Sequence, residues 1–274
     1  MRGAALLCLL VAGCAAPSSS AGGGIVSMNP CADAMLVQLV PPQRIAAISH
    51  YSRDPAASSI APQVAARFRT TSGTAEEVIA MRPDLVVASS FTASSTREAL
   101  ARAGVKTLYL DSPVTIEASK AQVRALAAAL DAVPAGEAMV ARIDHAVAAA
   151  AHSGPAVPAL LWIGGNLVSG GGTLLDEMMV KAGFSDHAAH YGLQHTGYLP
   201  IEHVLVDPPR VMLVPDEPGR DADSRAAQLR GRALARMGAK VDQARFPRSL
   251  VNCGGPVIAT AMTRLAEVRR EVGP

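Results

Sequence analysis

The sequence predicts an α/β protein built as two lobes, each with a parallel β-sheet, joined by one long helix. From residue 25 onwards, short apolar segments alternate with segments of helical spacing. A mostly helical stretch, 115–151, interrupts this alternation, which then resumes. Parallel strands need helical crossovers, so such alternation is typical of a doubly wound sheet. A chain of 274 residues is long enough for two lobes, each with its own core.

The first lobe is predicted to span residues 25–112. Its strands are short apolar runs such as "DLVVAS", bounded by turn residues, and its helices show apolar spacing, as in "CADAMLVQLV". The predicted strands cover 24–28, 44–49, 84–89 and 106–111, and the predicted helices cover 31–40, 76–81 and 96–104.

Residues 113–152 are predicted to connect the lobes through two helices. Pro134 divides this segment, and proline is tolerated in the first turn of a helix. One helix is therefore expected to end near Asp131, and a second, alanine-rich helix is expected over 134–152.

The second lobe is predicted to span residues 153–274 and to repeat the first. "DAMLVQ" in the first half matches "DEMMVK" in the second, and "ExxxxxxP" begins at both Glu76 and Glu202. Two facing lobes of this kind predict one ligand site between them, beyond the carboxyl ends of the strands. The predicted strands cover 159–164, 210–215 and 240–246, and the predicted helices cover 172–183, 201–206, 222–237 and 256–270.

The N-terminal segment indicates export. Residues 4–12 form an apolar run that is too short to span a bilayer and fits a secretory signal. "VAGC", residues 11–14, resembles the lipobox of bacterial lipoproteins, which implies a signal peptide over 1–13, an acylated Cys14 and a flexible tether over 14–24. An ordinary signal peptide cleaved nearby is the alternative, and it also exports the chain.

Charge and cysteine content narrow the classes of function. The net charge of +2 and the absence of a run of basic residues argue against a nucleic-acid-binding surface. Export places Cys31 and Cys253 in an oxidising compartment. The sequence leaves open whether they form a disulfide or remain two free thiols on cleft loops.

Catalytic motifs do not emerge from the sequence. It contains no Gly-x-Ser-x-Gly elbow and no His-Glu-x-x-His zinc motif. No carboxylate pair falls on the predicted cleft loops with the spacing that acid–base catalysis needs. We therefore expect no enzyme, and a chelatase-like activity is the least favoured alternative.

Six blocks of sequence resemble one family in the family's order, over about residues 25–270. They are "IVSMNPCADAML", "RIAAISHYSRDP", "GTAEEVIAMRPDLVVASS", "ARAGVKTLYLD", "GGGTLLDEMMVKAG" and "LPIEHVLVDPPRVMLV". The family is that of the periplasmic substrate-binding proteins for vitamin B12, ferric siderophores and haem, which serve ABC importers. The resemblance implies a class III architecture, with two Rossmann-like lobes on a rigid spine helix, here 134–152. It also implies a permease dimer with its ATPase as partners, and no cofactor beyond the transported chelate.

The resemblance assigns a docking role to Glu76 and Glu202. Family members carry one glutamate at the tip of each lobe, and the two bind arginine pockets on the permease subunits. Charge pairing of this kind steers encounter and fixes register. The alternative is that both glutamates only stabilise the N-termini of their helices, by about 0.3–1 kcal/mol. Glu77 has no matched role.

Candidate ligand contacts in the first lobe follow two predicted strands. "SHYSRDP" places His50, Tyr51, Ser52 and Arg53 at the end of the second strand. Tyr51 matches a ligand-contacting tyrosine of the B12 binders, and the Arg53 guanidinium suits a carboxylate or catecholate oxygen, or a structural ion pair. Phe91, on the polar loop "ASSFTASS", either contacts ligand or packs under the loop.

Candidate contacts in the second lobe lie on two loops. Trp162 precedes a glycine-rich segment that lets the backbone approach a bulky group, and this residue either contacts ligand or belongs to the core. The loop 186–200 is dense in histidine and tyrosine, and the His-x-x-His spacing of His187 and His190 weakly indicates a metal site. The expected ligand contacts on this loop are Tyr191, His195 and Tyr198.

The sequence therefore predicts a monomeric, exported, lipid-anchored solute-binding protein of the periplasm. The expected cargo is a corrinoid such as vitamin B12 or a ferric siderophore, because few cationic residues lie on the candidate loops. Haem is an alternative, with His50 or His195 as axial ligand. A surface lipoprotein that stores or senses metal is another. The particular chelate and permease do not follow from the sequence.

Overall fold

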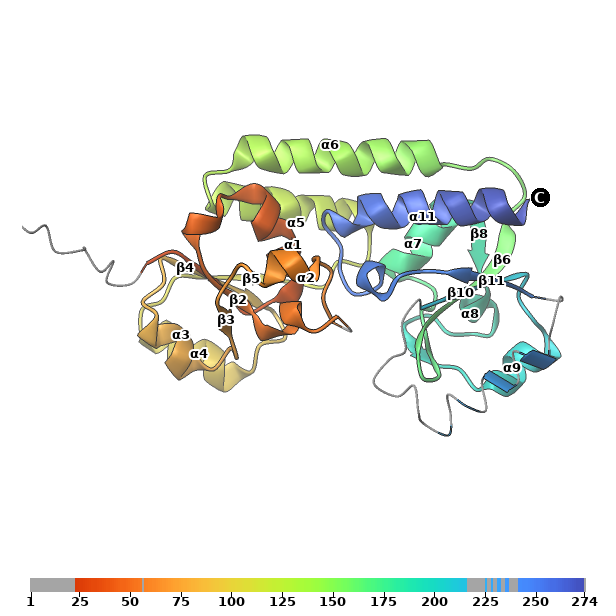
Figure 1. The fold of residues 1–274 in the computed structure, drawn as a ribbon, viewed down its shortest axis with the longest axis horizontal. Helices are drawn as coiled ribbons and strands as arrows, with labels where there is room; N and C mark the ends of the chain where they lie inside the picture. Colours follow the sequence, from red (N-terminus) through yellow and green to blue (C-terminus); the bar gives the residue numbers. More distant parts are fainter. Residues whose placement is uncertain are drawn as a thin grey trace, which may run out of the picture.

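The computed structural model describes residues 23–55, 57–215 and 241–273, with residues 225, 228, 231, 232, 235 and 236 between the last two ranges. The predicted signal peptide, Cys14 and most of the tether lie outside the described residues, as does most of the helix predicted over 222–237. Two lobes lie side by side below a set of long helices (Figure 1).

The first lobe contains a five-stranded parallel sheet in the order β3-β2-β1-β4-β5. Apolar clusters cover both of its faces, one with Leu36 and Ile48, the other with Val78 and Leu100. Burial on both faces explains why its strands are continuous apolar runs. The strands are β1 (Ile25–Ser27), β2 (Ile45–Ser49), β3 (Thr70–Thr71), β4 (Leu85–Ser89) and β5 (Thr107–Leu110). The helices are α1 (Pro30–Leu39), α2 (Pro62–Ala65), α3 (Ala75–Ala80) and α4 (Ser94–Arg102).

The second lobe repeats this topology and adds an antiparallel extension. Its strands are β6 (Val157–Gly164), β7 (Leu167–Val168), β8 (Phe184–Asp186), β9 (Gly197–Tyr198), β10 (Val211–Val214) and β11 (Asp242–Arg245). Its helices are α7 (Leu174–Lys181), α8 (His187–His190) and α9 (Ile201–Val206). The parallel order β8-β6-β10-β11 corresponds to β2-β1-β4-β5, while β7 and β9 pair antiparallel beyond β6.

Three long helices form the spine of the molecule: α5 (Ile116–Ala129), α6 (Val133–Ala150) and the last helix, α11 (Val257–Val272). Helix α6 packs against both of the others. Its Met139 belongs to the core of the first lobe and its Ile143 to that of the second. One rigid helix therefore contributes to both cores.

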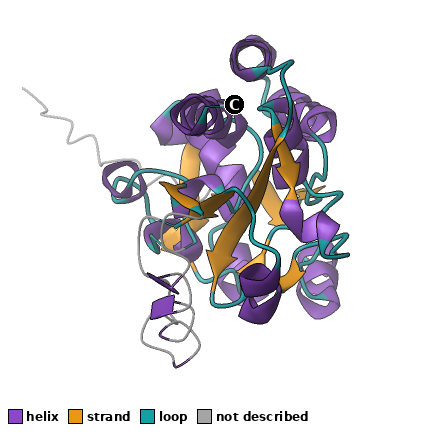
Figure 2. Ribbon diagram, turned by 90° about the vertical axis from the view of Figure 1, so that its right-hand side faces the viewer, coloured by secondary structure: helices purple, strands orange, loops and turns teal. Residues whose placement is uncertain are grey.

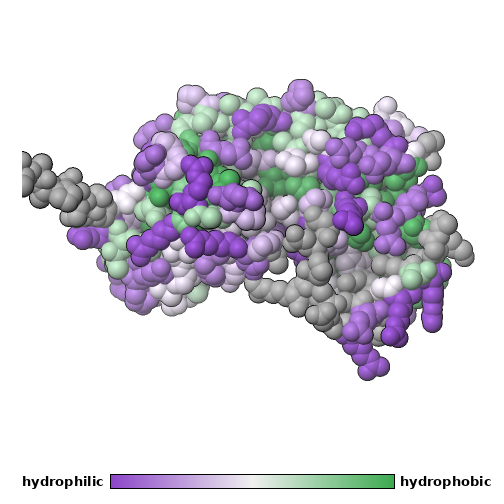
Figure 3. Space-filling view, in the orientation of Figure 1, coloured by the Kyte–Doolittle hydropathy of each residue, from purple (hydrophilic) through white to green (hydrophobic). Residues whose placement is uncertain are grey.

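The remaining views show how this spine is exposed. Figure 2 shows strands with helices on both sides and one spine helix end-on at the top. In Figure 3, pale green residues follow the upper edge, where Figure 1 places α6, and hydrophilic residues spread over the lower parts of both lobes. The exposed side of α6 is alanine-rich, which accounts for this weakly apolar edge.

The predicted fold class is confirmed, with two lobes of mainly parallel sheet and a long connecting helix. The structure adds short elements that the apolar pattern does not reveal, namely α2, α8, β3, β7, β8 and β9, each of four residues or fewer. Among the described residues, no helix is both long enough and apolar enough to cross a membrane.

Candidate functional site

A cavity of about 310 Å³ lies between the two lobes. It is lined from both lobes and from α5, mainly by loops that follow strands of the two sheets, as expected for parallel α/β lobes. Asp111 is the one charged residue among the described residues that line it. The other lining residues are Asn29, Cys31, Met35, Ser89, Leu110, Ser112, Pro113, Val114, Gln122, Thr173, Leu174, Leu175, Thr196, Val251, Asn252, Cys253, Gly254 and Gly255.

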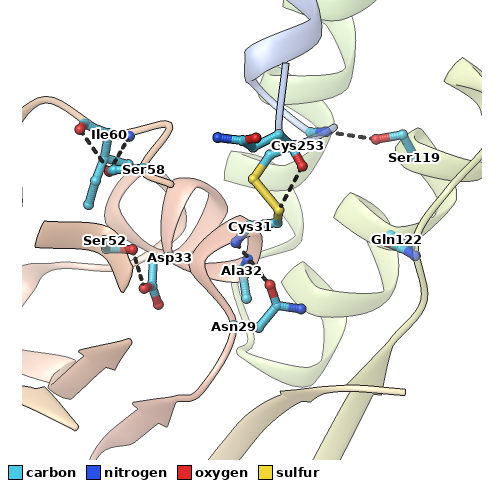
Figure 4. The surroundings of a disulfide bond; sticks show 12 residues. Asn29, Cys31, Ala32, Asp33, Ser52, Ser58, Ile60, Ser119, Gln122 and Cys253 are labelled. Carbon is cyan, nitrogen blue, oxygen red and sulfur yellow. Dashed lines mark hydrogen bonds between the residues drawn. A yellow bond between two sulfur atoms is a disulfide. The ribbon is translucent and has the colours of Figure 1, made fainter. Parts of the chain in front are cut away.

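A disulfide between Cys31 and Cys253 crosses from one lobe to the other at this cavity (Figure 4). The two Cα atoms are 5.2 Å apart. On one side, the Asn29 side chain accepts a hydrogen bond from the Cys31 N–H (2.9 Å) and so caps α1. On the other side, the Gly255 N–H donates to the Ser119 hydroxyl (2.7 Å). The sequence left this pairing open, and the structure has it bonded.

The turn His50–Arg53 follows β2 and rests on a buried carboxyl group. Asp33 accepts hydrogen bonds from the Ser49 N–H (2.9 Å) and from the Ser52 hydroxyl (2.6 Å). Burial raises the pKa of Asp33 to about 7, against the opposing effect of these hydrogen bonds. The hydroxyl of Ser52 therefore holds the turn in place, a role that the sequence did not suggest.

The aromatic pair on this turn is more accessible. The rings of His50 and Tyr51 are tilted against each other with centroids 4.0 Å apart, and Tyr51 is 47% exposed. The Nδ1 atom of His50 lies 3.2 Å from the Thr71 carbonyl oxygen, which leaves its other ring nitrogen for a further partner. The pair therefore stands at the carboxyl end of β2, where ligands of parallel sheets bind.

Arg53 lines a second interlobe cavity of about 320 Å³. Its guanidinium donates to the Phe68 carbonyl at 2.5 Å, so the side chain is partly held by its own lobe. Arg248 of the second lobe lines the same cavity, together with several serines. Two cationic side chains from opposite lobes suit an anionic group.

Phe91 and Tyr198 are the most exposed aromatic residues among those described, at 79% and 78%. Ser89 and Thr196 line the interlobe cavity, and Phe91 and Tyr198 lie two residues after them in the sequence. Two residues of extended chain span at most about 7 Å. Each lobe therefore carries one exposed ring on a segment that borders the cavity.

Trp162 belongs to the core instead of the ligand site. Its side chain is buried at 2% exposure, and its indole N–H donates to the Gly165 carbonyl (2.7 Å). The glycines after it do allow a close approach, but to the protein itself. A Cβ atom at Gly170 would lie 2.3 Å from the His195 carbonyl oxygen. The alternative that the sequence left open, a core tryptophan, is the observed one.

Tyr191 also binds within its own lobe. Its hydroxyl donates to the backbone carbonyl of Asp207, at the end of α9. Burial, and after it the charge of Asp207, raise the pKa of Tyr191 to about 12. His195 is exposed and adjoins Thr196 of the cavity wall. Of the three residues expected on this loop, His195 and Tyr198 are therefore near the cavity, and the hydroxyl of Tyr191 is engaged elsewhere.

Glu76 and Glu202 occupy equivalent places in the two lobes. Each lies exposed in the first turn of a six-residue helix, α3 or α9. Glu77 differs, because it accepts hydrogen bonds from the Ser72 N–H (2.9 Å) and hydroxyl (2.5 Å), which lower its pKa. The structure therefore separates Glu77, which binds Ser72 ahead of α3, from the exposed Glu76, and Thr74 is the residue whose side chain caps the helix.

Sequence reasoning missed most of the cavity wall. The wall includes the amide side chains of Gln122 and Asn252, and the backbone of Gly254 and Gly255. The one available signal was the glycine pair in "NCGGP", since Gly255 has a positive φ of 60° that favours glycine.

Comparison with known proteins places this geometry in one family. The family model described as periplasmic binding protein matches residues 25–239. A periplasmic haem-binding protein from Roseiflexus sp. RS-1, in its apo form, has 21% identity and a TM-score of 0.67, covering 92% of this chain and 99% of the other. A periplasmic haem-binding protein from Pseudomonas aeruginosa has 20% identity and a TM-score of 0.69, covering 89% and 91%. The periplasmic vitamin B12-binding protein BtuF of Vibrio cholerae has 18% identity and a TM-score of 0.65, covering 90% and 96%. No curated protein sequence matches significantly.

The chain thus has two α/β lobes with a cavity between them. It belongs to the periplasmic binding protein family, as the sequence blocks predicted. Its members are transport components and not enzymes, which confirms the expectation that this chain performs no catalysis.

Proposed function

We propose that the protein captures a metal chelate, either a corrinoid such as vitamin B12 or a ferric siderophore, between its lobes and delivers it to an ABC permease. The observation that carries this proposal is the interlobe cavity, whose wall is almost uncharged and combines apolar with amide and hydroxyl groups. Its volume of about 310 Å³ is at the lower end of the range for small-molecule sites, and it opens to solvent between the lobes. Such a wall suits a corrinoid or a neutral siderophore better than a polyanionic catecholate.

Exposed aromatic rings support a flat or bulky cargo. Phe91 of the first lobe and Tyr198 of the second lie two residues after lining residues of the cavity, with most of their surface in solvent. Rings of this size contribute strongly when they become buried against a ligand. Tyr51, half exposed after β2, adds a third ring on the side of the first lobe.

Haem is a second candidate, and specific residues favour it. His50 and Tyr51 offer an imidazole and a phenol, both of which ligate haem iron in proteins. Arg53 and Arg248 line the neighbouring cavity, where carboxylates of a porphyrin would find cationic partners. Two of the three similar structures reported above are described as haem-binding proteins.

The cargo is tested by calorimetric titration of the purified protein with cyanocobalamin, a ferric hydroxamate, a ferric catecholate and haemin. Because Trp162 is buried, its fluorescence is a weak reporter, and haemin is better followed by its own absorption band. We expect submicromolar one-to-one binding of one chelate, weakened about tenfold in Phe91→Ala or Tyr198→Ala. Val133→Ala, an exposed spine position, is the matched control. A folded protein that binds none of the four would refute the proposal.

We further propose that Glu76 and Glu202 dock the protein on the two permease subunits. Their exposure and their equivalent positions on α3 and α9 support this role. Reversing both charges, with Glu76→Arg and Glu202→Arg, is expected to abolish uptake and leave chelate binding unchanged. Glu98→Arg, also exposed but on α4, is the control. Unaltered uptake in the double variant would favour a storage or sensing lipoprotein instead.

Membrane attachment through acylated Cys14 and a monomeric state complete the proposal. Cys14 lies outside the described residues, and its support is the "VAGC" sequence. Cys14→Ser is expected to move the protein from the membrane fraction to the soluble periplasmic fraction. An unchanged distribution would contradict the lipid anchor.

A further inference from the structure

Three potential metal ligands converge on the second lobe where α8 meets the end of α9. His187 and His190 lie three residues apart on α8, so their side chains share one face of the helix. Their rings stack with centroids 4.9 Å apart. Asp207, the residue that ends α9, faces both of them.

The distances are close to those that a bound ion requires. The Nε2 atom of His190 lies 2.8 Å from Oδ2 of Asp207, and the Nε2 atom of His187 lies 4.0 Å from it. The three ligand atoms all lie within 4.8 Å of one another. With metal–ligand bonds of about 2.0–2.2 Å, two ligand atoms of a tetrahedral zinc site are separated by about 3.4 Å. Small side-chain rotations are enough to reach that geometry.

We propose that His187, His190 and Asp207 bind one divalent transition-metal ion, with Zn²⁺ as the type case. Two imidazole nitrogens and one carboxylate oxygen suit zinc, nickel or cobalt, whereas calcium and magnesium prefer oxygen ligands alone. Water would complete the coordination. The side chain of His187 is 10% exposed and those of His190 and Asp207 are 60% and 55% exposed, so an ion can enter from solvent.

The surroundings already hold this constellation in place. Asp186 caps α8 by accepting a hydrogen bond from the Ala188 N–H (2.8 Å), which fixes the start of the helix. The backbone carbonyl of Asp207 receives the Tyr191 hydroxyl and lies 3.1 Å from Nε2 of His187. An ion would therefore replace two hydrogen bonds, that of His190 with the Asp207 carboxylate and that of His187 with the Asp207 carbonyl, by three coordinate bonds.

This site is distinct from the cargo site. None of its three residues lines the interlobe cavity or the cavity with Arg53. Helix α9 has one fully buried residue, Val204, and an ion at Asp207 would tie its C-terminal end to α8. Binding would thereby steady the helix that carries Glu202, whatever the cargo proves to be.

The test is titration of the chelator-treated protein with Co²⁺ and Zn²⁺. Co²⁺ gives visible d–d absorption when nitrogen and oxygen ligands hold it in a tetrahedral site, so it reports geometry as well as affinity. We expect one equivalent to bind, displacement of Co²⁺ by Zn²⁺, and a higher thermal midpoint with Zn²⁺. His190→Ala and Asp207→Asn are expected to weaken binding at least tenfold and to abolish the visible bands.

A matched control comes from the same surface. His203→Ala removes an exposed histidine on α9 that stands near the ring of Tyr191 but is not one of the three ligands, and it should bind Co²⁺ like the native protein. Both ligand variants alter mainly exposed side chains, so they are expected to fold. Absence of Co²⁺ bands in the native protein, or equal affinity in His190→Ala, would overturn the proposal.

Discussion

Removing the Cys31–Cys253 disulfide is expected to destabilise the protein strongly. The bond closes a loop with a sequence separation of 222 residues. In the chain-entropy treatment, a crosslink over a loop of this length stabilises the folded state by about 5 kcal/mol, and loss of native disulfides typically costs about 2–5 kcal/mol. For a protein of this size, that corresponds to a fall of roughly 4–20 °C in the thermal midpoint.

The structure indicates where within that range the effect should lie. Helix α6 already joins the two cores through Met139 and Ile143, so the lobes stay associated after reduction. Any such contact that persists in the unfolded chain lowers the loop-closure entropy that the disulfide removes. We therefore expect the lower half of the range, with the greatest local effect at the cavity wall around residues 251–255.

The assay compares thermal and urea unfolding of the oxidised protein, the protein reduced by dithiothreitol, and the variant Cys31→Ser/Cys253→Ser. The reduced protein and the variant should unfold at the same lower midpoint, and the reductant should leave the variant unchanged. If the oxidised and reduced proteins share one midpoint, the reasoning from loop closure is wrong.

Three further predictions concern buried or closely packed groups. The native protein should lose stability between about pH 4 and pH 7, because burial raises the pKa of Asp33 in the folded state to about 7, while the unfolded chain releases this proton near pH 4. The Asp33→Asn variant lacks this titration, so its stability relative to the native protein should rise over the same range. Urea unfolding at both pH values measures the difference. Gly136→Val should lower the free energy of unfolding by about 1–3 kcal/mol, since even a Cβ atom there would lie 2.4 Å from that of Ala127. Gly136→Ala should cost less. If both variants unfolded at the midpoint of the native protein, the close crossing of α5 and α6 would be contradicted. Lys120→Met should cost about 1 kcal/mol by breaking the ion pairs with Asp144 (2.6 Å) and Glu117 (2.7 Å), and the loss should shrink in high salt.

The fold was predictable because its strongest signal is local. Strands buried on both faces, such as β4 and β6, must be apolar along most of their length, and their alternation with helices fixes a parallel sheet. The predicted match between the two halves is also present in the structure, since α3 precedes β4 and α9 precedes β10, and these two strands correspond in the two sheets. Short strands such as β7 and β9 could not be predicted, because two residues show no detectable periodicity.

The site was only partly predictable, because its contacts join distant positions. Ser52 reads as a polar loop residue, and only the fold places Asp33 beneath it. A lone tryptophan beside glycines reads equally as ligand contact or core, and the burial of Trp162 decides the matter. The His-x-x-His spacing was visible in the sequence. The third member of the group, Asp207, lies 17 residues from His190, and only the fold brings its carboxylate within 2.8 Å of that imidazole.

The spine, the disulfide and the Lys120 ion pairs act on one degree of freedom, the angle between the lobes. Helix α6 lies in both cores, the disulfide links α1 to the segment before α11, and Lys120 ties α5 to Asp144 of α6. With three such restraints, a hinge at a single loop cannot open without breaking packing or a covalent bond. Cargo capture must therefore proceed by small adjustments of the cavity loops. The same rigidity keeps α3 and α9 at a nearly constant separation, which is the condition under which two outward-facing glutamates can engage two fixed receptor sites at once.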